Sequence, residues 1–259
     1  MDGDVEKQPA AQGMRAVILA AGDGGRLGAH TAALPKPLVL LNGRPLIDYT
    51  LRSLADAGVR EVVVVTGYRE KQVMAALSDG VDPRVAIRFV SNPRFRAGAS
   101  LSLRAARRAM GEERFLLAMS DHLLSAPLVQ RLLADGDIAE PGISLVAADA
   151  GAAHSPEYVD EATRLGIDAE GFVTEIGKGL RGWRALDAGA FSLSPTVWEA
   201  VDAVAEDCEL SVIFAELARR KRLRTADITG SFWYDVDTAD DLAAAGELLA
   251  NPNGSACGV

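Results

Sequence analysis

The sequence predicts an α/β fold with a doubly wound, mostly parallel (Rossmann-like) mixed sheet and helices on both faces. Short apolar runs rich in β-branched residues alternate with amphipathic helical segments from residue 14 to about 148. Such alternation is typical of parallel strands joined by crossover helices. The chain has 259 residues, of which 49% are hydrophobic, so it can bury a large core. In sheets of this kind, ligands bind beyond the carboxyl ends of the strands.

The strands expected in the first half are short apolar runs bounded by glycine or polar residues. They span Met14–Ala20, Glu61–Thr66, Val85–Val90, Phe115–Met119 and Ile143–Ala148. The helices expected between them have apolar residues at helical spacing, and the first ends at a glycine, as helices often do. They span Pro45–Gly58, Glu70–Leu77, Ser100–Met110 and Pro127–Ala134.

The second half lacks the regular alternation, which predicts a mixed continuation of the sheet. We expect strands over Thr163–Ile167, Val173–Ile176, Ala190–Leu193, Leu223–Ile228 and Phe232–Val236. We expect helices over Val197–Val204, Ser211–Arg220 and Ala239–Leu249. No repeat or linker divides the chain, so residues 14–250 are predicted to form one domain, with a loose leader over 1–13 and a disordered tail over 251–259.

Charge and composition exclude several classes of protein. The net charge of −9 argues against nonspecific nucleic-acid binding, which needs clustered Lys and Arg. No apolar run reaches the roughly 18–20 residues of a membrane span, and the acidic, polar start is unlike a signal peptide. The two cysteines, Cys208 and Cys257, do not make a disulfide framework. We therefore expect a cytoplasmic protein without membrane insertion.

A glycine-rich loop follows the first strand, with the sequence Leu19-Ala20-Ala21-Gly22-Asp23-Gly24-Gly25-Arg26-Leu27. Glycines at this place let backbone N–H groups approach phosphates, and Arg26 adds a forked donor. The loop lacks the Gly-Lys-Ser/Thr of a Walker A motif. It also differs from the dinucleotide fingerprint in glycine spacing and in having no acidic residue after the second strand. Phosphate binding and a flexible turn are both compatible with it.

Lys36 lies between Pro35 and Pro37. The two prolines predict a stiff, extended segment on which an ammonium group is held at little entropic cost. The lysine is interpreted as a phosphate clamp, with an exposed loop lysine as the alternative.

Two further segments carry carboxylates in places suited to a metal. Asp121 directly follows an apolar strand, and its side chain is expected to point into the ligand crevice beside His122. Asp235 and Asp237 alternate on a strand-like segment, so both are predicted to face one way and to repel each other unless a cation lies between them. Carboxylates are typical Mg²⁺ ligands. The alternative is helix capping, by Asp121 at the next helix and by Asp237 or Thr238 at the last one.

Together these four features resemble the sugar-phosphate nucleotidyltransferases, a family with a glycine-rich loop, a Pro-Lys-Pro segment, a strand-end Asp and a late Trp-x-Asp motif. Within that family the chain looks most like the CTP:inositol-1-phosphate cytidylyltransferases. That closer resemblance rests on Met119-Ser120-Asp121-His122, Glu175-Ile176-Gly177-Lys178-Gly179-Leu180, Leu186-Asp187-Ala188-Gly189 and Phe232-Trp233-Tyr234-Asp235-Val236-Asp237-Thr238. It implies a nucleotidyltransferase (GT-A-like) fold. It also implies a Mg²⁺-dependent enzyme that transfers CMP from CTP to a small phosphate- or phosphonate-bearing alcohol and releases pyrophosphate.

The resemblance also implies a role for each matching residue. The nucleotide would be bound by Leu19, Ala20, Ala21, Gly22, Gly24, Gly25, Gly98, Ser100 and Ser120. The catalytic cations would be Arg26 and Lys36 at the triphosphate and Lys178 at the acceptor phosphate. The metal ligands would be drawn from Asp121, Asp235 and Asp237. The acceptor would contact His122, Lys178, Asp187 and Gly189.

Other functions stay open at this point. The acceptor could instead be a hydroxyalkylphosphonate, phosphocholine or a sugar 1-phosphate, the last with another nucleoside triphosphate. A non-catalytic nucleotide-binding regulator would be expected to lack the metal carboxylates or the Pro-Lys-Pro lysine. A nicotinamide-dependent dehydrogenase is disfavoured by the glycine spacing. A homodimer is one option for assembly.

Overall fold

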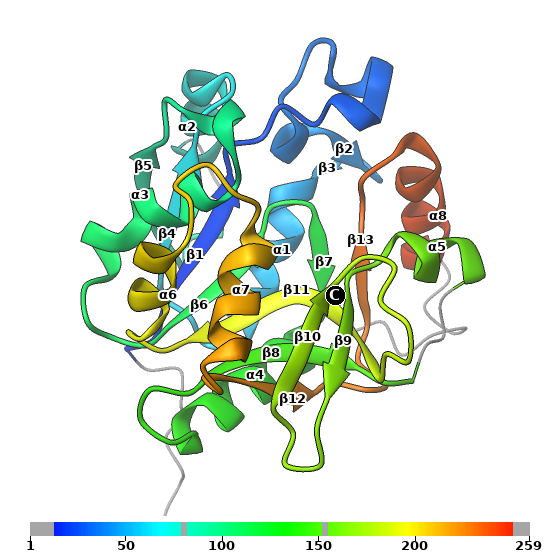
Figure 1. Cartoon of the computed structure of the whole chain (residues 1–259). Coiled ribbons are helices and arrows are strands. Elements are labelled where there is room, and N and C mark those ends of the chain that lie inside the picture. Colours follow the sequence, from blue (N-terminus) through cyan, green and yellow to red (C-terminus); the bar gives the residue numbers. More distant parts are fainter. Residues whose placement is uncertain (1–12, 79–81, 152–154, 251–259) are drawn as a thin grey trace, which may run out of the picture.

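A nine-stranded mixed sheet forms the centre of the computed structural model, which describes residues 13–78, 82–151 and 155–250 (Figure 1). The main path runs β10-β9-β11-β6-β1-β4-β5, and β8 and β12 continue from β11. The strands are β1 Arg15–Ala20, β4 Glu61–Thr66, β5 Ala86–Ser91, β6 Phe115–Met119, β8 Ser144–Asp149, β9 Arg164–Ile167, β10 Val173–Gly177, β11 Ala185–Leu193 and β12 Leu223–Asp227. The first four are parallel, and β11 pairs antiparallel with β6. The predicted α/β class and mixed sheet are confirmed.

Helices cover both faces of the sheet (Figure 1). They are α1 Leu46–Asp56, α2 Glu70–Ser78, α3 Ser100–Met110, α4 Ala126–Ile138, α5 Pro156–Glu161, α6 Val197–Ala203, α7 Leu210–Arg219 and α8 Ala239–Ala250. Alternate residues of β1 show how the two layers form. Ile18 belongs to the core shared with α1, α2 and α4, whereas Val17 belongs to the core shared with α3, α6 and α7. Successive strand side chains point to opposite faces, so a doubly covered strand is apolar throughout.

Two small antiparallel pairs and three 3-10 helices complete the fold. β2 (Leu40–Leu41) pairs with β3 (Arg44–Pro45), and β7 (His122–Leu124) pairs with β13 (Trp233–Asp235). The 3-10 helices are η1 Gly25–Thr31, η2 Lys36–Leu38 and η3 Phe95–Ala97. The β7–β13 pair matters most for function, because it joins the chain after β6 to a segment more than a hundred residues later.

The structure corrects several predicted boundaries. β11 begins at Ala185, not at residue 190, and a register shift between Asp187 and Phe191 accommodates its polar and glycine residues. Helix α4 continues to Ile138. The segment after Pro35 is not extended as predicted, because residues 36–38 form η2. α5, β7 and the β2–β3 pair were not predicted, since each is only one turn or a few residues long.

Two predicted segments fall outside the described residues: the tail over 251–259, and all but the last residue of the leader over 1–13. None of the helices in the described part of the chain combines the length and the apolar character that a bilayer crossing needs.

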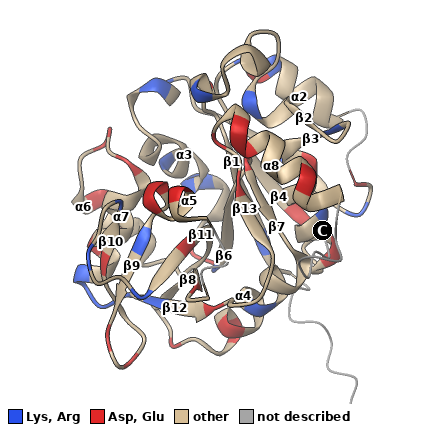
Figure 2. Cartoon of the chain, turned by 90° about the vertical axis from the view of Figure 1, so that its right-hand side faces the viewer, with Lys and Arg blue, Asp and Glu red and all other residues tan. Residues whose placement is uncertain are grey.

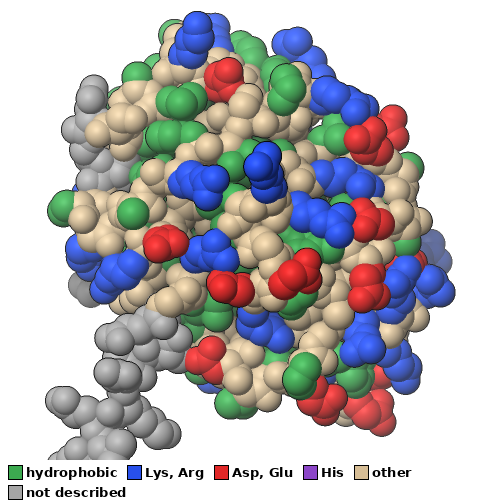
Figure 3. Space-filling model, turned by 90° about the vertical axis from the view of Figure 1, so that its left-hand side faces the viewer, with side chains coloured by type: hydrophobic (Ala, Val, Ile, Leu, Met, Phe, Trp, Pro, Cys, Tyr) green, Lys and Arg blue, Asp and Glu red, His purple; other side chains and the backbone are tan. Residues whose placement is uncertain are grey.

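Basic and acidic side chains are intermixed on the face shown in Figure 3. Ion pairs in the α3–α6 region illustrate this: Arg94 Nη1 lies 2.9 Å from Glu206 Oε2, and Arg107 Nη1 lies 2.8 Å from Asp202 Oδ1. These pairs connect α3 and the loop before it to α6 and the loop after it.

Candidate active site

A cavity of about 1360 Å³ opens at the carboxyl ends of β1 and β6. It is the place where the fold class predicts a ligand. Most of the candidate residues line it: Leu19, Ala21, Gly22, Arg26, Lys36, Gly98, Ser120, Asp121, His122, Lys178, Asp187, Gly189, Asp235 and Asp237. The structure therefore brings the four sequence motifs together around one space.

Four predicted nucleotide contacts are not among the lining residues: Ala20, Gly24, Gly25 and Ser100. Ala20 is buried in the sheet. The Ser100 side chain is fully buried, and its hydroxyl donates to the Glu206 carbonyl at 2.6 Å. The Ser100 hydroxyl therefore anchors the start of α3, and recognition of a base by the Gly98–Ser100 segment stays a prediction, with Gly98 lining the cavity.

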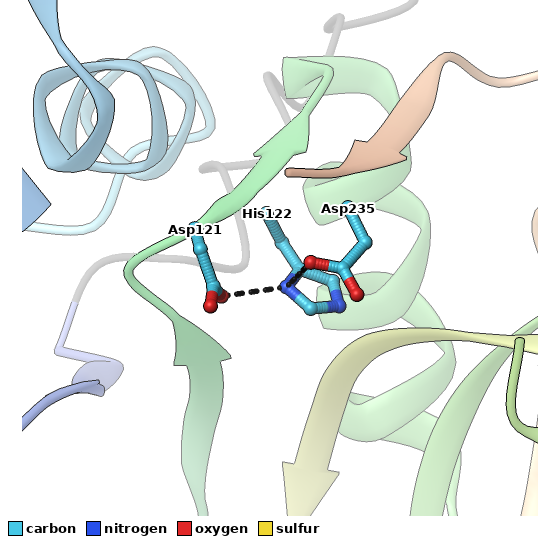
Figure 4. A group of neighbouring side chains, drawn as sticks. All are labelled: Asp121, His122 and Asp235. Atoms are coloured by element: carbon cyan, nitrogen blue, oxygen red, sulfur yellow. Dashed lines mark hydrogen bonds and ion pairs between the residues drawn. The ribbon is translucent and has the colours of Figure 1, made fainter. Parts of the chain in front are cut away.

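The β7–β13 pair creates a cluster of Asp121, His122 and Asp235 (Figure 4). His122 and Asp235 are direct partners in the antiparallel register. The Nδ1 atom of His122 lies 2.9 Å from Asp121 Oδ1 and 3.5 Å from Asp235 Oδ1. Two short strands thus place carboxylates from distant parts of the chain on either side of one imidazole.

Burial and neighbouring charge act in opposite directions on these groups. Burial lowers the pKa of His122, but Asp235 and Asp121 raise it to about 9, so the ring is an imidazolium at neutral pH. Burial raises the pKa of Asp235 to about 7. Burial acts in the same sense on Asp121, yet Lys36 and His122 hold its pKa well below the usual range.

Lys36 is the central cation of the cavity. Its Nζ lies 2.5 Å from Asp121 Oδ2 and 2.7 Å from Asp237 Oδ1. Burial alone would lower the pKa of Lys36, but Asp121 and Asp237 raise it well above its ordinary value. Gly24 makes room for this side chain, because a Cβ atom at residue 24 would lie 2.5 Å from the Lys36 Cβ. That steric demand explains one glycine of the loop without any phosphate contact.

The donor set around Asp121 and Asp235 fits a divalent cation. Asp121, His122 and Asp235 each offer one ligand atom, and these atoms lie within 4.8 Å of one another. Oδ1 of Asp235 is buried and has no hydrogen-bond partner among the described residues, and a bound cation would satisfy it. Mg²⁺ prefers oxygen ligands, so the two carboxylates would be its ligands and His122 would orient them. Asp237 lies outside this group and pairs with Lys36 and Arg26.

Gly189 and Asp187 support His122 from β11. A Cβ at residue 189 would lie 2.2 Å from His122 Nε2, and the glycine has φ +70°. Asp187 accepts a hydrogen bond from the Gly189 amide at 2.8 Å, and burial raises the pKa of Asp187 to about 6. The predicted acceptor residues thus also shape the wall behind the imidazole.

Other cavity residues were not found from the sequence. Tyr158 on α5 accepts a hydrogen bond from the Asp235 amide at 2.8 Å, and its ring lies 4.9 Å from that of Tyr234. Glu209 and Ser211, at the start of α7, also line the cavity. α5 has no apolar period, so no sequence signal pointed to Tyr158. Lys178 is exposed at the cavity edge.

A family model for the MobA-like NTP transferase domain matches residues 16–217, which include nearly all of the parallel half of the sheet and the cavity residues up to Phe214. The chain belongs to this family. Its fold is therefore that of a nucleotidyltransferase, and the matched range contains the glycine-rich loop, Lys36 and Asp121.

Individual relatives of this MobA-like domain agree with the family match. A bifunctional IPC transferase and DIPP synthase of Rubrobacter xylanophilus is 35% identical over 251 residues, covering 94% of this chain and 54% of the relative. A CMP-5'-(3-aminopropyl)phosphonate synthase of Streptomyces rubellomurinus is 32% identical over 239 residues, covering 92% of this chain and 35% of the relative. The chain spans about half the length of the four bifunctional IPC transferase and DIPP synthase relatives that it matches.

A solved structure supports the fold. The inositol-1-phosphate CTP transferase from T. maritima superimposes with a TM-score of 0.78 at 22% identity, covering 94% of this chain and 98% of that one. At this identity the likeness establishes the nucleotidyltransferase architecture.

Proposed function

We propose that this chain transfers CMP from CTP to a small phosphorylated alcohol of the inositol 1-phosphate kind and releases pyrophosphate. One observation carries the proposal: a single cavity joins the glycine-rich loop, two cations of the N-terminal half and the Asp121–Asp235 carboxylates. The curated relatives named IPC transferases, at 31–35% identity, support the choice of CTP and an inositol phosphate.

The chain's own residues would bind the two anions and place them for in-line transfer. Arg26 and Lys36 hold the triphosphate and balance the charge of the departing pyrophosphate. Lys178, which is exposed and also lines the cavity, attracts the acceptor phosphate. Mg²⁺ held by Asp121 and Asp235 would stabilise negative charge at the α-phosphate. Catalysis in this arrangement is positioning and charge neutralisation, with no covalent enzyme intermediate.

The experiment is a pyrophosphate-release assay with Mg²⁺. CTP, UTP and dTTP are each paired with inositol 1-phosphate, phosphocholine, an aminoalkylphosphonate and glucose 1-phosphate. We expect CTP with inositol 1-phosphate to give the highest kcat/KM. Absence of pyrophosphate from every pair would refute the proposal, and a preference for UTP with glucose 1-phosphate would refute the choice of substrates.

A second acceptor class is favoured by a specific feature of the cavity wall. The rings of Tyr158 and Tyr234 lie close together, with Trp233 6.0 Å from Tyr158. Acidic residues of α5 and α8 also line the cavity, and Figure 2 marks the acidic residues on these two helices in red. Aromatic and acidic groups suit an ammonium-bearing acceptor. The aminoalkylphosphonate and phosphocholine arms of the same assay test this alternative.

A further inference from the structure

Asp237 connects two cations that come from different segments of the N-terminal half. Its Oδ2 lies 2.7 Å from Arg26 Nη2, and its Oδ1 lies 2.7 Å from Lys36 Nζ. Arg26 belongs to η1 and Lys36 begins η2. Both oxygens of the Asp237 carboxylate are therefore already paired with positive charge.

Lys36 is shared between two carboxylates of different kinds. One is Asp121, which belongs to the group that could hold a metal, and the other is Asp237, which does not. Like charges repel strongly at this range in a buried setting. A divalent cation and the Lys36 ammonium therefore cannot both lie against Asp121 without a large cost, and Lys36 needs another anionic partner when the metal site is filled.

We propose that Asp237 is a positioning residue that receives Lys36 when a divalent cation binds at Asp121 and Asp235, and that Asp237 is not itself a metal ligand. Asp237 keeps both phosphate-binding cations at the cavity while Asp121 is released for the metal. This inference rests on the cation site of the proposed function.

The surroundings of Asp237 and Lys36 suit this role. Asp241 Oδ2 accepts from the amides of Asp237 and Thr238, while the Asp241 amide donates to Thr238 Oγ1, which makes a capping box at the start of α8. This box fixes the backbone of Asp237. On the other side, the missing side chain of Gly24 leaves the space that the Lys36 stem occupies. Because Lys36 contacts both carboxylates at once, it can leave Asp121 and keep its contact with Asp237.

The proposal predicts a coupling between residues 36 and 237 in metal binding. In Asp237→Asn, Lys36 has only the metal-site carboxylates as partners, so it competes with the metal. In Lys36→Met the ammonium group that competes with the metal is absent. Removing the Asp237 charge in this background then weakens metal binding only by the loss of a screened electrostatic attraction between that carboxylate and the metal.

The experiment is a double-mutant cycle measured by Mn²⁺ binding, detected by electron paramagnetic resonance without turnover. Wild type, Asp237→Asn, Lys36→Met and the double variant are titrated at 0.15 M ionic strength, after circular dichroism and thermal melting show that each is folded. We expect Asp237→Asn to weaken Mn²⁺ binding about tenfold or more in the wild-type background and about threefold or less in the Lys36→Met background. Lys36→Met alone should bind Mn²⁺ at least as tightly as wild type.

Asp237→Glu is the matched control, because it keeps the charge and should bind Mn²⁺ within about threefold of wild type. Equal losses of Mn²⁺ affinity from Asp237→Asn in the wild-type and Lys36→Met backgrounds would overturn the inference, because a direct metal ligand or a purely electrostatic effect gives that result. This outcome would leave the proposed transfer reaction intact. Failure of wild type to bind Mn²⁺ would overturn the cation site and this inference together, and failure only of the pyrophosphate assay would overturn the proposed reaction alone.

Discussion

Replacing Gly189 by alanine tests how closely β11 supports His122. The new Cβ would lie 2.2 Å from His122 Nε2 and Cδ2, whereas ordinary contact begins near 3.4 Å. The imidazole must therefore move by about 1 Å, which disturbs the 2.9 Å contact of its Nδ1 with Asp121. A misplacement of this size in a catalytic site commonly costs about 10²-fold in rate.

The same substitution has a second cost that must be separated from the first. At φ +70° an alanine is strained by roughly 1–2 kcal/mol in the left-handed region. Gly43→Ala is the matched control, because Gly43 has φ +80° and no atom within 4 Å of the Cβ position. It lies in the turn between β2 and β3, outside the residues that line the cavity.

The assay combines urea unfolding with pyrophosphate-release kinetics on both variants. We expect both to lose about 1–2 kcal/mol of unfolding free energy from backbone strain. Only Gly189→Ala should also lose about 10²-fold in kcat/KM. Wild-type turnover in Gly189→Ala, or an equal loss of turnover in Gly43→Ala, would refute the role given to the Gly189–His122 contact.

Three further predictions concern charged groups of the cavity. Asp121→Ala should lower kcat by about 10²–10³, by analogy with the removal of other charge-stabilising contacts, and turnover near wild type in the purified variant would contradict its assignment. Lys36→Ala should lower kcat by a similar factor. Lys71 is an exposed lysine on α2, and Lys71→Ala should keep full activity. Equal activities of the two variants would remove Lys36 from the mechanism. Burial raises the pKa of Asp187 to about 6, so its contribution to stability is complete below about pH 4 and is lost as the pH rises through 6. Asp187→Asn can still accept the Gly189 amide but cannot ionise. The free energy of unfolding of this variant, measured with urea, should therefore equal that of wild type near pH 4 and exceed it by about 3 kcal/mol at pH 8. If the unfolding free energies of the two proteins changed with pH in parallel, a buried carboxylate with a raised pKa would be contradicted.

The parallel half of the fold was predictable because its pattern is local. β1, β4 and β6 are largely apolar runs that are buried almost throughout, and doubly covered strands need no other signal. The bounds of β4, α3 and β6 agree with the sequence prediction. β11 was predicted too short, because its first half carries Asp187 and Gly189, which disfavour a strand in isolation and are tolerated here through the register shift.

The site was predictable as a set of motifs but not as a set of contacts. Sequence alternation placed Asp235 and Asp237 on one face, but β13 ends at Asp235, and the two carboxylates have different partners. Asp235 lies beside His122 because β7 pairs with β13, and Asp237 pairs with Lys36, which begins η2. Both contacts join segments that are far apart in the sequence. Of the two residues considered as caps of the last helix, Asp237 and Thr238, it is Thr238 whose hydroxyl accepts a hydrogen bond from the Asp241 amide.

The proposed reaction depends most on a divalent cation held by Asp121 and Asp235 beside the nucleotide. Electron paramagnetic resonance of Mn²⁺ with CTP and stoichiometric protein measures this directly, against free Mn²⁺–CTP as the reference. We predict one protein-bound Mn²⁺ per chain in wild type and a spectrum indistinguishable from the reference in Asp121→Ala and in Asp235→Ala. Wild-type Mn²⁺ binding in either variant would contradict the central claim.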